Sequence, residues 1–369
     1  GAASNGLAGL AHMRGGDTNE TLVILDGLPL YEPFHLRMLQ SPSSVLDERI
    51  VEGLDVFAGG FTAEYGDRMS AIIDARTLRP AADAYYELGL SLIHANALAS
   101  HRFADGRGQW LTSFRRSNLD EVADIMESEI GESSYLDGFA RVDFAWSPDT
   151  RGSLQTLLAR DQAEITNPAG TEHATAEYSN AYVWGTLAHD WSARLATTAI
   201  LSFTDVSAER KAAVDEPGKR TGAVDDMRDY DVLGLKVDAS YATDRWLQRA
   251  GVDVRKLEAT YDYTGGVDFA PDYPYPGAGA QDISRALAPN PSGEHFAAYY
   301  TVRGRLTDAL TAEVGLRWDE QTYGADADDQ LGPRLNLAWR IDEYTRLLAS
   351  WGRYQQFEGI EELQVEDGV

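Results

Sequence analysis

The residues that could do chemistry are scattered along this sequence of 369 residues. Its seven histidines include no pair at the spacing of a metal-binding helix or zinc finger, and it has no cysteine. The acidic run at 325–330 is the nearest approach to a calcium loop, but it lacks the glycine and the closing glutamate of an EF-hand. No nucleophile elbow, P-loop or dinucleotide-binding glycine motif occurs in its required strand and helix context. We therefore predict a protein without catalytic residues, metal sites or cofactors, in which the acidic run is a solvated loop.

The composition favours an exported, β-rich protein. The formal charge of -27 makes nucleic acid an unsuitable partner, because so acidic a chain repels phosphates. The mean hydropathy is negative and no run of about 18 apolar residues occurs, which excludes a transmembrane helix but not a barrel, whose strands have only one apolar face. The 18 tyrosines, eight tryptophans and 34 glycines suit β structure, and the lack of cysteine suits an oxidising periplasm.

The stretch from Met13 to Leu78 is organised differently from the rest of the chain. It contains Arg-Gly-Gly at 14–16, Leu-Asp-Gly-Leu-Pro-Leu at 25–30, Gly-Gly-Phe at 59–61, Tyr-Gly at 65–66 and Ile-Asp-Ala-Arg-Thr at 73–77. Short apolar strands that end in glycine or proline turns predict a small, tightly turned α+β unit. We also expect a strand at 50–57 and a short helix at about 42–48, because Pro42 after Ser41 is a favourable helix start.

From Tyr85 onward the pattern changes to long segments of alternating polarity. Val314, Leu316 and Trp318 share one face, for example, while Glu313 and Arg317 share the other. Such segments are typical of strands that are apolar toward lipid and polar toward a wet interior. A soluble β-sandwich with one face on its core is the alternative, since it gives a similar alternation. The clearest segments are 140–146, 195–203, 233–241, 296–306, 310–319 and 334–342.

The tryptophans and the connection lengths favour the barrel. Trp146, Trp191 and Trp246 lie beside short turns, where an interfacial aromatic girdle would place them. We interpret the short links as periplasmic turns and the long ones as outer loops. The first two strands, at about 84–93 and 97–104, then join at 94–96, a turn follows at 104–108, and an outer loop at 118–132 carries a short helix. The short links are 147–152, 192–194, 243–245, 307–309 and 343–345, and the long links are about 166–180, 212–228, 265–294 and 324–332.

Counting in this way gives about thirteen strands, whereas single-chain bacterial barrels have an even number and plugged transporters about 22. We therefore expect the sequence to be an internal piece of a longer protein, with an export signal before Gly1 and closing strands after Val369. The predicted division is a first domain at 1–80 and barrel strands at 81–369.

Taken in order, the motifs of 13–78 resemble the plug domain of TonB-dependent outer-membrane receptors. The resemblance implies a small α+β plug inside an antiparallel transmembrane β-barrel, of which about 13 of some 22 strands are present, in the outer membrane of a Gram-negative bacterium. It implies energised import of a scarce nutrient such as a ferric siderophore, cobalamin, oligosaccharide or peptide. Its implied partners are the nutrient, a TonB-type energy-transducing complex, outer-membrane lipid and lipopolysaccharide. The alternative function is that of a non-transport surface adhesion or glycan-binding β protein, with no energy-coupling segment upstream and no further strands downstream.

The resemblance also guides the choice of site residues. It places ligand contacts on the plug apex and on the inner wall of the outer loops, and it implies charges that lock plug to barrel. For Arg115, the alternation itself predicts a lumen-facing side chain that pairs with plug acids. Loop packing by the aromatic residues and ordinary surface charge are the alternatives at these positions. The ligand-binding candidates are Tyr31, Phe34, His35, Arg37, Tyr261, Phe269 and Tyr273, and the lock candidates are Arg14, Glu52, Asp55, Arg68 and Arg115.

Overall fold

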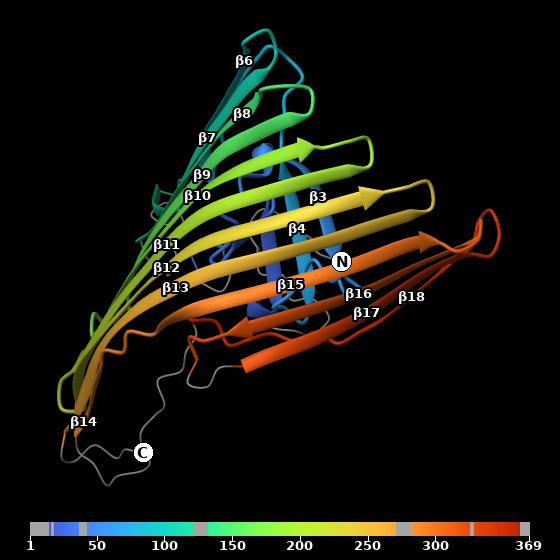
Figure 1. The fold of residues 1–369 in the computed structure, drawn as a ribbon. Helices are drawn as coiled ribbons and strands as arrows, with labels where there is room; N and C mark the ends of the chain where they lie inside the picture. Colours follow the sequence, from blue (N-terminus) through green and yellow to red (C-terminus); the bar gives the residue numbers. More distant parts are fainter. Residues whose placement is uncertain are drawn as a thin grey trace.

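The computed structural model describes residues 15, 18–36, 43–121, 132–270, 282–324 and 328–361. These residues form a small mixed sheet near the N-terminus and a large antiparallel sheet that curves around it (Figure 1). We call residues 18–36 and 43–77 the inner unit and the large sheet the wall. No helix in these ranges is long and apolar enough to span a membrane.

The inner unit is built on a four-stranded sheet in the order β2-β1-β4-β3. All residues of β1, which lies between β2 and β4, are buried, and this explains the apolar run that follows Thr21. Asp26 and Gly27, at φ 46° and 88°, make the two-residue turn to β2, and an Asp-Gly pair is the preferred sequence for such a type I′ turn. The elements are a 3-10 turn at Thr18–Glu20, β1 at Thr21–Leu25, β2 at Leu28–Leu30, a 3-10 turn at Glu48–Ile50, β3 at Val51–Phe57 and β4 at Ala71–Thr77.

The strand expected at 50–57 is confirmed as β3, but the helix expected at 42–48 is wrong over the described residues 43–47, and only Glu48 begins a 3-10 turn. The backbone there bonds to the preceding loop, because Val45 N donates to Pro33 O at 3.0 Å and Ser44 forms a β-bridge with Phe34. Val45 is fully buried in the core shared with the wall. Tertiary burial therefore outweighs the local helix signal at Pro42.

The wall confirms the expected antiparallel barrel strands. Thirteen of its 14 strands follow one another in a single hydrogen-bonded path from β5 to β18, and the short β14 pairs with β13 beside that path. Within the described part of the chain the sheet is not closed, so β5 and β18 form its two edges. The strands are β5 Ala84–Leu90, β6 His94–Phe103, β7 Gly108–Ser117, β8 Glu132–Ala145, β9 Thr150–Thr166, β10 Glu172–Asp190, β11 Leu195–Glu216, β12 Arg220–Ala242, β13 Trp246–Phe269, β14 Asp282–Leu287, β15 Ser292–Arg305, β16 Leu310–Gln321, β17 Asp328–Arg340 and β18 Arg346–Gly352.

The two faces of the wall differ as the alternation predicts. On β16, Val314 and Leu316 are exposed on the outward face at 59% and 47%, while Glu313 and Arg317 are buried on the inward face. The described residues place no second sheet on the outward side, so the β-sandwich alternative is wrong. Exposed tryptophans stand beside the short turns at 146, 191 and 246, whereas Trp184 points inward and is buried.

The short turns are confirmed, but the expected long loops are wrong in whole or in part. The loop expected at 265–294 contains the end of β13, all of β14 and the start of β15, and the loop expected at 324–332 contains the start of β17 at Asp328. The predicted loops at 166–180 and 212–228 are continuous hairpins with tight turns at 167–171 and 217–219, so the ladder extends beyond the apolar belt. Ion pairs hold these extensions together, for example Arg220 with Glu172 at 2.5 Å across the two hairpins. The polarity pattern fades there because both faces are in water, although the strand geometry continues.

The first hairpin of the wall also differs from expectation. Its turn lies at 91–93 and not at 94–96, because Ser91 Oγ accepts hydrogen bonds from the amides of Ile93 and His94. Asn96 pairs in the ladder with Gly89, where the missing Cβ leaves room for the asparagine side chain. The turn expected at 104–108 is confirmed, and residues 119–121 of the expected outer helix are helical while 122–131 lie outside the described residues.

The inner unit and the wall share one apolar core. Trp184 and Tyr182 of β10 and Phe139 of β8 pack inward against the inner sheet, and a fully buried aromatic or aliphatic side chain stabilises a fold by about 1.5–3 kcal/mol. This core fixes how the loop after β2 meets the wall. The inner-unit members are Val23, Leu25, Leu28, Leu30, Val45, Ile50 and Ala75.

The Gly27→Ala substitution should destabilise the inner unit by about 2–4 kcal/mol. Alanine is strained at φ 88°, and its Cβ would lie 2.7 Å from Ile200 Cδ1 of the wall. The midpoint of urea unfolding, followed by tryptophan fluorescence of the complete protein, measures the loss. Gly218→Ala is the matched control, since Gly218 has φ 74° but open space around it, so its inner unit should unfold as in wild type. Equal shifts for the two variants would refute the close contact between the turn and the wall.

Candidate functional site

A cavity of about 420 Å³ lies where the loop after β2 meets the inward face of β10–β13. Five aromatic side chains line it, Tyr31 and Phe34 from the loop and Tyr178, Tyr230 and Tyr261 from the wall. Three arginines and three acids also line it. The cavity therefore combines flat apolar surfaces with both signs of charge, which suits an amphiphilic ligand of small-molecule size. The charged lining residues are Arg68, Arg210, Arg228, Glu32, Asp229 and Glu361.

A buried carboxylate positions two of these arginines. Asp226, on the inward face of β12, is 5% exposed and pairs with both Arg210 and Arg228, the latter at 3.1 Å. The Arg228 guanidinium also lies 5.6 Å above the Tyr261 ring. Asp226 thus holds Arg210 of β11 and Arg228 of β12 at the aromatic side of the cavity, which both arginines line.

The loop side of the cavity is fixed by hydrogen bonds to the wall. Glu32 N donates to Tyr182 Oη at 3.0 Å, and Asn180 Nδ2 donates to Glu32 O at 3.2 Å. Arg255 Nη1 donates to Tyr31 Oη at 3.5 Å, and burial raises the pKa of Tyr31, so the phenol stays protonated at neutral pH. The Tyr31 ring meets the Tyr230 ring edge-on at 6.0 Å. The loop therefore presents Tyr31 to the cavity in one orientation.

His35, next to the cavity-lining Phe34, is fully buried between two strands of the wall. Its Nε2 lies 3.1 Å from Asp137 Oδ2 of β8, and its Nδ1 is hydrogen-bonded to Asp161 of β9. Burial acts to lower the pKa of His35, but the hydrogen bonds to the two carboxylates outweigh it and raise the pKa above its ordinary value. The two wall carboxylates therefore favour the protonated form of His35, whose ring joins the inner unit to the wall.

A second attachment holds the turn that contains Phe61 and Tyr65. Arg334 of β17 donates through Nη1 to the carbonyl oxygens of Phe61, Thr62 and Tyr65 at 3.2, 2.8 and 2.9 Å. Its guanidinium lies against the Phe61 and Tyr354 rings, 4.7 and 4.4 Å from their centres, and the two rings also contact each other with their centres 4.4 Å apart. Three carbonyl dipoles and two ring faces thus stabilise this buried charge.

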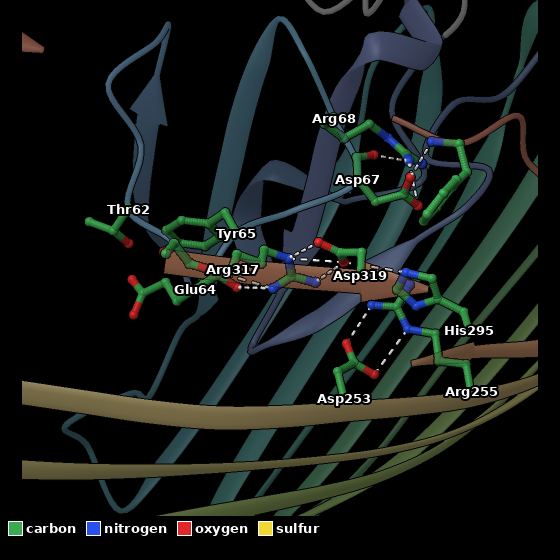
Figure 2. A network of polar contacts seen from close by, with 12 residues as sticks. Thr62, Glu64, Tyr65, Asp67, Arg68, Asp253, Arg255, His295, Arg317 and Asp319 are labelled. Carbon is green, nitrogen blue, oxygen red and sulfur yellow. Dashed lines mark hydrogen bonds and ion pairs between the residues drawn. The ribbon is translucent and has the colours of Figure 1, made fainter. Parts of the chain in front are cut away.

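Arg317 of β16 extends the same attachment. Its Nη1 donates to Glu64 O at 3.2 Å, while its Nη2 pairs with Asp319 at 2.7 Å (Figure 2). A Cβ at Gly66 would lie 1.9 Å from Arg317 Nε, so the guanidinium occupies the space that glycine leaves. Glu64 itself pairs with Arg249 of β13 at 2.7 Å. The Tyr-Gly motif at 65–66 is therefore a docking point for arginines of the wall.

The structure brings together some of the predicted ligand-binding residues. Tyr31, Phe34 and Tyr261 line the same cavity, although Tyr261 is far from the other two in sequence. His35 faces the wall carboxylates instead, and Phe269 lies at the far end of β13. The candidates Arg37 and Tyr273 lie outside the described residues, as does the lock candidate Arg14.

The predicted lock residues occupy different environments. Arg115 joins wall and inner unit, since its Nη2 donates to Ser44 O at 2.5 Å and its Nη1 lies 3.8 Å from Glu48. Asp55 pairs with Arg76 inside the inner unit at 2.5 Å. Arg68 bonds to the neighbouring Asp67 and lines the cavity. Glu52 is exposed on β3.

Several contact residues of the wall escaped the sequence reasoning. Arg141, buried on β8, pairs with Asp26 of the inner turn and donates to Thr77, and Arg249, Arg317 and Arg334 make the contacts described above. The signal that the sequence offers is that each of these arginines falls on the polar face of an alternating strand. Alternation assigns the face, but it cannot identify the partner.

Residues 128–365 match the family described as TonB dependent receptor-like, beta-barrel. Three solved structures with a similar fold are the siderophore receptor PiuA from Acinetobacter baumannii (12% identity, TM-score 0.59, 90% of this chain and 56% of that one), the unliganded ferric citrate transporter FecA (13%, 0.61, 90% and 54%), and the outer-membrane ferripyoverdine receptor of Pseudomonas aeruginosa bound to ferripyoverdine (12%, 0.58, 89% and 50%). The chain thus spans about half the length of these structures, and at such identities the likeness concerns the fold. No curated protein is similar enough in sequence to count as a match.

Replacing Arg334 by alanine should weaken the docking of the inner unit by about 2–4 kcal/mol, because three buried carbonyl oxygens lose their donor. Arg334→Lys should recover only part of the loss, since one ammonium cannot reproduce the planar contact with both rings. The urea midpoint of the inner unit in the complete protein measures both effects. Arg340→Ala on the same strand is the control, because Arg340 is exposed and bonds to Asp308 O in a short turn. A loss in Arg340→Ala as large as in Arg334→Ala would contradict the assignment.

Proposed function

The chain belongs to the family of TonB-dependent receptors, and we propose that it is part of an outer-membrane importer that takes up a scarce nutrient with energy supplied from the inner membrane. Receptors of this family reside in the outer membrane of Gram-negative bacteria and are not enzymes. In the proposal, the inner unit is the plug, residues 1–80 form the plug domain and residues 81–369 form barrel strands. The nutrient is a ferric siderophore, a cobalamin, an oligosaccharide or a peptide.

The observation that carries the proposal is the cavity between the inner unit and the wall. A surface adhesion protein needs its contacts on exposed loops, whereas these aromatic and charged side chains converge on a cavity inside the curve of the wall. The cavity lies at the half of β11 and β12 that leads to their long hairpin. If the long hairpins face outward, as in other outer-membrane barrels, a ligand reaches this cavity from the cell exterior.

The attachments of the inner unit support a transport role. The inner unit is bound to the wall by arginine contacts and by the His35 cluster, so a path past it opens only when several buried contacts break together. Such a movement requires work, and the outer membrane has no energy source of its own. A TonB-type complex that pulls on the plug would supply that work, and outer-membrane lipid and lipopolysaccharide would surround the apolar belt of the wall.

The experiment is an uptake and binding assay with the complete receptor that contains this chain, using a panel of ferric siderophores, cobalamin, oligosaccharides and peptides. We expect one panel class to bind, and its uptake to require an active TonB-type complex. Tyr31→Ala and Phe34→Ala should each weaken binding roughly tenfold, because each removes an aromatic wall of the cavity.

Tyr344→Ala is the matched control, because Tyr344 is 95% exposed in a short turn and should bind as in wild type. Uptake that continues at the same rate in the absence of the TonB-type complex would refute the proposed import. Binding that is insensitive to both loop substitutions would remove the cavity from the proposal.

A further inference from the structure

The geometry around His35 points to a proton-dependent attachment of the cavity loop. We propose that His35 positions the loop at 31–36 only while its imidazole carries two protons, so that the ligand cavity loosens as the pH rises. The consequence for the ligand rests on the proposed function. The consequence for the loop does not, because it follows from contacts between the inner unit and the wall.

Both ring nitrogens of His35 face carboxylate oxygens, and a carboxylate only accepts hydrogen bonds. The ring must therefore donate from both nitrogens, which requires the imidazolium form or a proton shared with one carboxyl. The Tyr135 ring stacks on the imidazole, 4.3 Å between centroids, and excludes water from that side. The His35 side chain is 0% exposed, so no water molecule can enter to donate a hydrogen bond to the carboxylate when the imidazole has lost its proton.

The surrounding charges balance only when the cluster holds that proton. Arg115 of β7 donates from Nε to Asp137 at 2.8 Å, so two cations, Arg115 and His35, face the two carboxylates of Asp137 and Asp161. Without the proton, two buried carboxylates face one guanidinium, and the excess negative charge is costly. On the inner-unit side, Asp47 is paired with Arg49, and Glu48 lies 3.8 Å from Arg115.

The loop depends on this cluster for its shape. Asp161 accepts a hydrogen bond from Leu36 N at 2.8 Å with the carboxylate oxygen that does not face His35. Leu36 has φ 53°, a left-handed conformation that costs a non-glycine residue about 1–2 kcal/mol. Asp161 therefore offsets local strain and fixes the imidazole at once. Phe34, directly before His35, and Tyr31 are the residues that this loop places in the cavity.

The sign of the pH dependence follows from the raised pKa of folded His35. A free histidine titrates near 6.5, so the stabilisation is complete below about pH 6.5 and is lost as the pH rises through the higher pKa of the folded state. One proton linked to opening changes the opening equilibrium by up to tenfold per pH unit in this window. Above the folded pKa, the loop should reach a constant, weaker attachment.

Hydrogen–deuterium exchange of peptides that cover 31–36 tests the proposal in the ligand-free, complete receptor between pH 5.5 and 9. After correction for intrinsic exchange, wild-type protection should be constant at low pH and then fall by up to tenfold per unit before it levels. His35→Gln should give low protection at every pH, since the two N–H donors of glutamine are on one nitrogen and cannot reach carboxylates at the positions of both ring nitrogens. Asp161→Asn should move the fall to lower pH, because one of the two groups that favour the proton is neutral. The control is His173→Gln, which alters an exposed histidine 3.9 Å from Glu164 and should leave the profile unchanged.

A flat wild-type profile, or a His35→Gln protein with the wild-type pH response, would overturn the proposal. Wild-type behaviour of Asp161→Asn would do the same, even if His35→Gln failed to fold. The exchange measurement uses no nutrient, so its failure would leave the proposed import standing. A receptor that binds no panel nutrient but shows the expected profile would refute the import and keep the proton-dependent attachment.

Discussion

The strict alternation of a β-strand is the constraint on which this molecule depends. Every strand of the wall must direct one side chain outward and the next inward, and its backbone groups are satisfied by neighbouring strands. The outward side chains can all be apolar, whereas the inward side chains pack directly against the inner unit. Charged inward residues such as Arg141 and Arg334 are buried by this geometry, so each needs a partner on the inner unit. The docking of the inner unit is the consequence of satisfying them.

The partners are of two kinds, and they respond differently to their surroundings. Arg334 and Arg317 bind main-chain carbonyls, whose hydrogen-bonding capacity does not change with pH. The His35 cluster binds through an imidazole whose hydrogen bonds to Asp137 and Asp161 depend on its proton. The cavity loop belongs to the second kind, while the turn around Tyr65 belongs to the first. The inner unit thus has one attachment that does not change with pH, at the turn around Tyr65, and one that depends on a proton, at the cavity loop.

Much of the architecture could be predicted because its signals are local. Period-two polarity identified the strands, and the Asp-Gly pair identified the turn after β1. At the hairpin extensions the polarity pattern predicts loops, because outside the apolar belt it ends before the ladder does. The helix expected near Pro42 does not form because Val45 is buried in the core shared with the wall. A local sequence rule cannot predict this burial, since it depends on residues far away in the chain. His35 is separated from Asp137 and Asp161 by 102 and 126 residues, so an attachment built from them leaves no trace in the spacing of either segment.

The capture of main-chain oxygens by Arg334 has an evolutionary consequence. A guanidinium that binds main-chain carbonyl oxygens does not depend on the side chains of the residues that carry them. Thr62, whose carbonyl lies 2.8 Å from Arg334, can drift in identity without loss of that bond, whereas position 66 is confined to glycine by the guanidinium of Arg317. Related receptors can therefore vary the side chains of this turn and still keep the inner unit attached to the wall, provided that the arginines and one missing Cβ are inherited together.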